Sequence, residues 1–210
     1  RFWNLDQTQI TSDEATNLEP GFWSNWFGGW ETKRNPPLFR FLIHMFPSDQ
    51  LVPLWLIRAP SALFGSLGVF LIYLLARQRC RGPWALAAAA MLCFYPLHVR
   101  YSQWERAYVL LLCFLLLSHM ARHAANEGRK WTWSLYGIFA SLAVFTHYLA
   151  PIFLLGHVID QFLNQRRKVF RLLIAMAPVV AVAAPFAINI LMDAGNVSQG
   201  LPFSTHWHEI

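Results

Sequence analysis

The segment LWLIRAPSALFGSLGVFLIYLLA, residues 54–76, decides the fold class, because it is long, apolar and followed directly by Arg77. As an α-helix it rises about 34 Å, enough to cross the roughly 30 Å hydrocarbon core of a bilayer. Other apolar segments follow along the chain, at residues 83–96, 107–121, 131–145, 149–163 and 172–192. We therefore predict an all-α integral membrane protein, a polytopic helix bundle of about six spans.

The composition of the whole chain agrees with this prediction. Hydrophobic residues make up 56% of the 210 residues and charged residues only 13%, against about 25% charged in soluble domains. These values exclude a soluble globular protein and a disordered chain, and three cysteines exclude a disulfide scaffold.

The basic residues are placed in a pattern that orients the bundle. Ten of the 17 lie in three loops, at residues 77–82, 122–130 and 164–171. Of the 11 acidic residues, only Glu127 and Asp160 lie on the same side as these loops. Six spans put these loops on one side of the membrane, which the positive-inside rule makes cytoplasmic. We interpret the basic residues as cytoplasmic anchors and expect no nucleic-acid partner, despite the net charge of +6.

Three regions follow from this division. Residues 1–50 are acidic and aromatic and are predicted to form an outer loop with interfacial helices. Within them, residues 38–46 form an apolar run after Asn35-Pro36-Pro37 that is too short to span a bilayer. Residues 51–192 would form the transmembrane bundle, and residues 193–210 an outer polar tail. Candidate chemistry therefore gathers on the outer side.

An acidic pair, Asp13-Glu14, lies in the outer loop. A carboxylate near apolar rings has a raised pKa, which suits a general base, and the second acid would orient it. The alternative is that Ser12 or Asp13 caps a helix that begins near Glu14.

Two arginines stand at the predicted outer ends of spans. Arg106 ends the stretch Tyr101-Ser102-Gln103-Trp104-Glu105-Arg106, and Arg58 precedes Pro60, which we expect to begin a helix. A guanidinium there can bind a phosphate through two hydrogen bonds. Alternatively, Arg106 anchors a helix end, paired with Glu105, and Arg58 reaches from the helix to the membrane surface.

The stretch Thr146-His147-Tyr148 separates two apolar segments on the same side. His147 and Tyr148 could bind a polar substrate, or they mark a simple helix break. We find no metal site of usual ligand spacing.

Taken in order, these stretches resemble the GT-C glycosyltransferases. The quoted pieces are Asp13-Glu14, Asn35-Pro36-Pro37-Leu38, Arg58-Ala59-Pro60-Ser61-Ala62-Leu63-Phe64-Gly65, Tyr101-Ser102-Gln103 with Arg106-Ala107-Tyr108, and Thr146-His147-Tyr148. The nearest branch is that of protein O-mannosyltransferases and the bacterial lipid A aminoarabinose transferase. The resemblance covers most of residues 1–165, the N-terminal part of such enzymes, whose first helix would precede Arg1 and whose remaining helices would follow Ile210.

The resemblance implies a function. Such enzymes transfer a sugar from a polyprenyl-phosphate donor to a lipid, glycan or protein acceptor on the extracytoplasmic face. It implies Asp13 as the catalytic base with Glu14 beside it. It also implies that Arg106 helps to hold the donor or the acidic pair. With Arg106, we expect Arg58, Tyr101, His147 and Tyr148 to bind the substrate. We expect a multi-pass protein of the bacterial inner membrane, among membrane lipids and membrane-protein partners, and leave a divalent cation open.

The chain departs from the family pattern at two places. Asn35 stands where the family usually has His before two prolines, and Trp104-Glu105-Arg106 stands where it usually has Glu-Ala-Arg. Because the first and the last helices of such enzymes would lie outside this sequence, a non-catalytic subunit that keeps the GT-C scaffold and packs against partners is the second hypothesis. A transporter fits less well, because the spans hold few internal charges and show no inverted repeat.

Overall fold

The computed structural model describes Leu5 and residues 38–44, 53–184 and 187–188 of the chain. The described residues form helices joined by short turns, with no strand among them, which confirms the all-α prediction for this part. The elements are α2 (Leu38–His44), α3 (Leu54–Arg77), α4 (Gly82–Phe94), α5 (Pro96–Gln103), α6 (Tyr108–Asn126), α7 (Thr132–Thr146), α8 (Ala150–Asn164), the 3-10 turn η2 (Arg166–Lys168) and α9 (Val169–Ala175).

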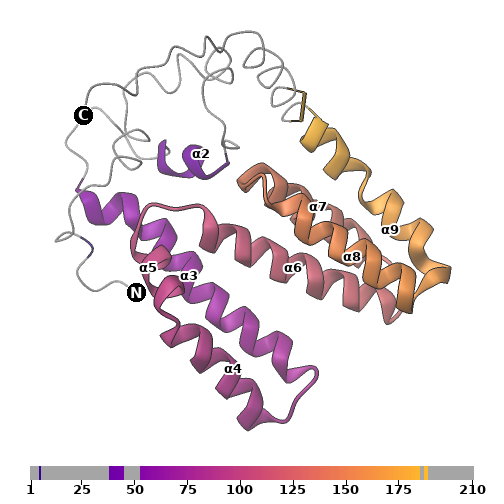
Figure 1. Cartoon of the computed structure of the whole chain (residues 1–210), viewed down its shortest axis with the longest axis horizontal. Helices are drawn as coiled ribbons and strands as arrows, with labels where there is room; N and C mark the ends of the chain where they lie inside the picture. The colour runs from indigo at the N-terminus through magenta and orange to yellow at the C-terminus, as the bar shows by residue number, and fades with distance from the viewer. Residues whose placement is uncertain (1–4, 6–37, 45–52, 185–186, 189–210) are drawn as a thin grey trace, which may run out of the picture.

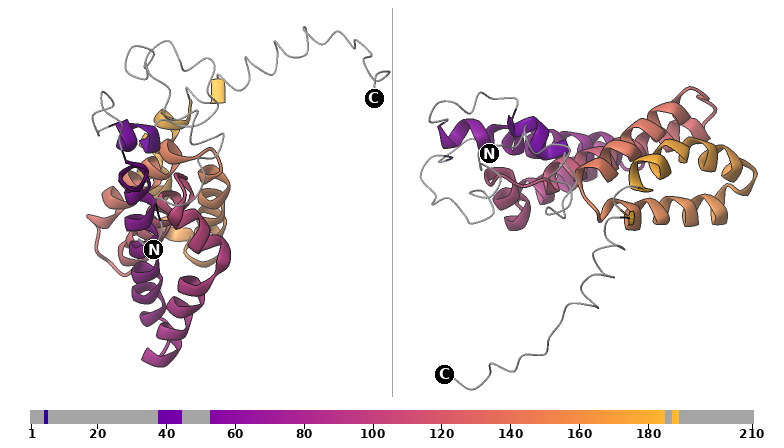
Figure 2. Two further views of the ribbon diagram at one scale, coloured as in Figure 1. Left: turned by 90° about the vertical axis from the view of Figure 1, so that its left-hand side faces the viewer. Right: turned by 90° about the horizontal axis from the view of Figure 1, so that it is seen from above.

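The helices pack in chain order around two long central ones. α3 packs against α4, α5 and α6, and α6 in turn packs against α7. α8 and α9 lie against α7, on the side away from α4 (Figures 1 and 2). In Figure 1 the loop after α3 lies at the bottom and the loops after α6 and α8 lie at the right, all at the ends of their helices away from α2, which lies at the upper left. The three basic loops thus share one end of the bundle; which side of the membrane that end faces stays a prediction.

Fewer of the described helices qualify as candidate membrane spans than the six that were predicted. α3 and α6 are long and apolar enough to cross a membrane, and α4 with α5 makes a third candidate that is bent by 59°. α7 is apolar but shorter. Among the described residues, length and composition thus give two candidate spans, or three if the bent pair is one span, and the count of six stays a prediction.

Prolines determine several helix boundaries, not always as predicted. α2 follows Pro37 and α5 begins at Pro96, so the expected breaks are confirmed. The expectation for Pro60 was wrong, because α3 begins after Pro53 and contains Pro60 in its second turn. The early turn of α3 forms because Ile57 packs in a buried cluster with Phe39 and Leu110. A proline near the start of a helix removes only one backbone hydrogen bond there.

The region between residues 98 and 106, which separates two of the predicted apolar segments, is largely helical. α5 covers it to Gln103 and lies directly on α3, where Gly65 faces Ser102. A Cβ atom at Gly65 would come within 2.6 Å of Ser102 Cβ. The missing side chain of Gly65 therefore lets α5 lie against α3, and this contact positions the segment that carries Arg106.

Candidate functional site

Arg58 lies inside the bundle rather than at its surface. Its side chain is fully buried, and its Nη1 donates a hydrogen bond of 2.7 Å to the carbonyl oxygen of Leu5, which is also buried. The buried guanidinium of Arg58 thus holds a residue that precedes Asp13 in the chain against α3. Asp13 and Glu14 themselves lie outside the described residues.

The backbone of Arg106 lies against Ser61, which stands one helical turn after Arg58 on α3. The backbone N–H of Arg106 donates to Ser61 Oγ at 3.4 Å, and the same oxygen lies 3.5 Å from the Arg106 carbonyl. Ser61 and the neighbouring Glu105 are buried, and Arg106 is partly buried. The structure therefore brings the two predicted phosphate ligands to one end of the bundle, at the start of α3 and the start of α6.

The other three predicted site residues form part of one aromatic row. The ring of Tyr101 lies 4.8 Å from that of Tyr108, Tyr108 lies 5.1 Å from His147, and His147 lies 4.3 Å from Tyr148, measured between ring centres. The row joins α5, α6 and the break between α7 and α8. Tyr108 links the row; it stands in the quoted motif, but it was not among the predicted site residues.

His147 is a neutral group in this row. The predicted break is confirmed, because α7 ends at Thr146 and His147 has an extended backbone, with φ −159° and ψ 138°. Its Nδ1 accepts a hydrogen bond of 3.1 Å from the backbone N–H of Leu149, so the neutral ring carries its proton on Nε2. Burial lowers the pKa of His147 below its ordinary value near 6.5. His147 can therefore donate from Nε2 at neutral pH without carrying charge.

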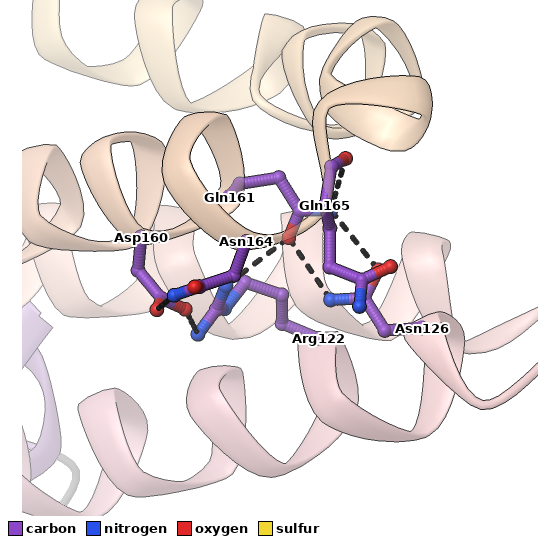
Figure 3. Close-up of polar contacts among 6 residues, drawn as sticks. All are labelled: Arg122, Asn126, Asp160, Gln161, Asn164 and Gln165. Carbon is purple, nitrogen blue, oxygen red and sulfur yellow. Dashed lines mark hydrogen bonds and ion pairs between the residues drawn. The ribbon is translucent and has the colours of Figure 1, made fainter.

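A second polar group, at the basic end of the bundle, was missed by the sequence analysis (Figure 3). Arg122 was interpreted as a loop anchor, and this was wrong, since it lies within α6 and is only 5% exposed. Its Nη2 lies 2.6 Å from an Asp160 oxygen, and its Nη1 donates to Gln161 Oε1 at 3.1 Å. The spacing of polar residues within the apolar segments of α6 and α8 was the available signal.

Gln161 also pairs with Asn126 in both directions. Asn126 Nδ2 donates to Gln161 Oε1 at 2.9 Å, and Gln161 Nε2 donates to Asn126 Oδ1 at 3.0 Å. Lys168 Nζ donates to the Asn126 carbonyl. These bonds fasten the end of α6 to the end of α8 and to η2.

No group of three or more His, Cys, Asp or Glu side chains that could hold a metal ion occurs within the described residues. A divalent cation at the acidic pair therefore stays open, because that pair lies outside them.

These observations define a class, a helical integral membrane protein with polar side chains gathered at both ends of its helices. The family model described as dolichyl-phosphate-mannose-protein mannosyltransferase matches residues 34–192, and the chain belongs to this family. No curated protein and no solved structure matches the chain. Family membership confirms the GT-C resemblance and implies a glycosyltransferase of GT-C type, a family that uses polyprenyl-phosphate sugar donors and membrane-embedded acceptors.

Proposed function

We propose that this protein transfers a sugar from a polyprenyl-phosphate donor to a lipid, glycan or protein acceptor on the extracytoplasmic face of the membrane. The family match over residues 34–192 is the observation that carries the proposal. The gathering of Arg58, Arg106 and the aromatic row at the end of the bundle away from the basic loops supports it. The basic loops would then face the cytoplasm of a bacterial cell.

Asp13 would act as the general base. Its carboxylate takes the proton of the acceptor hydroxyl while that oxygen attacks C1 of the sugar. The bond between C1 and the phosphate oxygen breaks, and the polyprenyl phosphate leaves with the electron pair. Glu14 would orient the Asp13 carboxylate, and residues 1–50 would form the outer loop that carries both acidic residues.

Arg106 would bind the departing phosphate. It lies two residues before the first residue of α6, and guanidinium donors stabilise the charge that develops on the leaving oxygens. Arg58 is enclosed and already donates to Leu5, so it would add positive charge from behind Arg106 and hold the N-terminal segment in place. Tyr101, His147 and Tyr148 would line the same pocket through the aromatic row.

The test is Asp13→Asn in the whole protein, with Asp49→Asn as the matched control from the same region, residues 1–50. We expect Asp13→Asn to lower kcat by at least about 100-fold, the usual contribution of a general base, and to leave donor binding unchanged. Asp49→Asn should leave both unchanged. Normal transfer by Asp13→Asn at normal expression would reject the base role. A wild-type protein that binds no polyprenyl-phosphate sugar would favour the scaffold hypothesis.

A further inference from the structure

Several buried polar atoms lie between α6, α7 and α8, in the basic half of the bundle. Arg122 Nε, Trp133 Nε1, Tyr136 Oη and His157 Nδ1 are all buried and have no hydrogen-bond partner among the described residues. Tyr136 is fully buried, Arg122 is 5% exposed and Trp133 is 8% exposed. None of these four atoms belongs to the proposed sugar-transfer site.

The four side chains lie in one place. Ring centres are 6.4 Å apart for Trp133 and Tyr136 and 5.9 Å apart for Tyr136 and His157. Arg122 faces the same helix surface as His157, because it contacts Asp160 and Gln161, which follow His157 by three and four residues on α8.

An unpaired polar atom inside a protein is destabilising, and four of them together are uncommon in a native structure. Two of the atoms, Arg122 Nε and Trp133 Nε1, can only donate a hydrogen bond. Tyr136 Oη can donate or accept, and so can His157 Nδ1, depending on where its ring carries the proton. A common partner must therefore be able both to accept and to donate.

An anion accepts only, and the charge of Arg122 is already balanced by Asp160 at 2.6 Å. The set offers no excess positive charge to hold an anion. Water accepts two hydrogen bonds and donates two, and a buried water typically makes two to four bonds to polar groups of this kind. Water is thus the ligand that matches both the donor pattern and the charge.

We infer that Arg122, Trp133, Tyr136 and His157 enclose an internal water site that joins α6, α7 and α8. Such a site also accounts for helices too short to span a bilayer at this place. α7 and α8 have 15 residues each, which rise only about 22 Å. The backbone groups at the ends of such short helices need protein or water around them rather than lipid. The water site would adjoin the ion pair between Arg122 and Asp160, which Figure 3 shows, and the two together would form a polar interior at the basic end.

The test is Tyr136→Phe in the whole protein, with thermal unfolding in detergent as the readout. If Tyr136 Oη binds water, the variant loses hydrogen bonds and its Tm falls by about 2–4 °C. If the site is dry, removal of an unpaired hydroxyl leaves Tm unchanged or raises it, which would overturn the inference. Tyr95→Phe is the matched control, because Tyr95 is 52% exposed, and it should not move Tm.

A density map that resolves interior waters gives an independent readout. We expect a water peak within hydrogen-bond distance of at least two of the four atoms. An empty site in a map that shows waters elsewhere inside the bundle would contradict the inference. A bromide signal at the site in crystals soaked with bromide would contradict it as well, since it would assign the site to an anion.

Discussion

Replacing Gly65 by alanine tests whether the contact between α3 and α5 determines the position of the candidate site. The new Cβ would lie 2.6 Å from Ser102 Cβ, which is 0.8 Å short of the 3.4 Å at which ordinary contact begins. It would also crowd Ser102 Oγ, which donates to the His98 carbonyl at 2.5 Å. Overpacking of this kind typically costs about 1–3 kcal/mol, so we expect Tm to fall by about 2–12 °C.

Two further variants isolate the cause. Gly156→Ala is the matched control, because nothing lies within 4 Å of a Cβ there, and an alanine inside α8 should be neutral or stabilising. Ser102→Gly should rescue Gly65→Ala, since the nearest remaining atom, the α-carbon of residue 102, is 3.4 Å away. Thermal unfolding of the single and double variants gives the coupling between the two positions. If Gly65→Ala is as stable as Gly156→Ala, or if Ser102→Gly gives no rescue, the close-contact reasoning is refuted.

Three other predictions concern single residues. Asp160→Asn should lower the free energy of unfolding by about 1–2 kcal/mol, which is less than the loss of a fully buried pair because the Asp160 side chain is 47% exposed. Glu127→Gln, in an exposed pair, should change it by less than about 0.5 kcal/mol. Equal unfolding midpoints for these two variants would count against a special role for the pair of Arg122 and Asp160. Folding lowers the pKa of His147, so the unfolded chain binds the proton of this side chain more readily than the folded one. The free energy of unfolding should therefore fall as pH drops below about 6.5 and hold steady above it. If a His147→Gln variant has the same pH profile of stability as the wild type, another group is responsible. Gly128 has φ +111°, so Gly128→Ala should cost about 1–2 kcal/mol in denaturant unfolding, and no loss would mean that the turn after α6 adapts.

The sequence predicts the helices well because their signals are local. The break at Thr146-His147-Tyr148 and the end of the apolar segment near Pro96 depend on neighbouring residues alone, and the structure has a helix boundary at both places. Pro60 was misplaced because the packing of Ile57 with Phe39 and Leu110 extends α3 toward its N-terminus, and such tertiary packing overrides a local proline signal.

The candidate site was predictable only in part. Motif order singled out Arg58, Arg106 and His147, but the contacts that bring such residues together join distant parts of the chain, as Ser61 does with Arg106 over 45 residues. Arg122 was misassigned for the same reason. Its partner Gln161 is 39 residues away, and in a linear reading a buried arginine at the end of a helix is indistinguishable from a surface anchor.

The reciprocal amide pair of Asn126 and Gln161 has a consequence for how this protein can evolve. Each amide uses the other as both donor and acceptor, so a substitution at Gln161 removes both partners of the Asn126 amide, and a substitution at Asn126 leaves Gln161 Nε2 with only the Gln165 carbonyl oxygen at 3.5 Å. Sequence drift at either position is then tolerated only when the other changes with it. Across homologues these two positions should covary. Where one position is apolar, the other should be apolar as well.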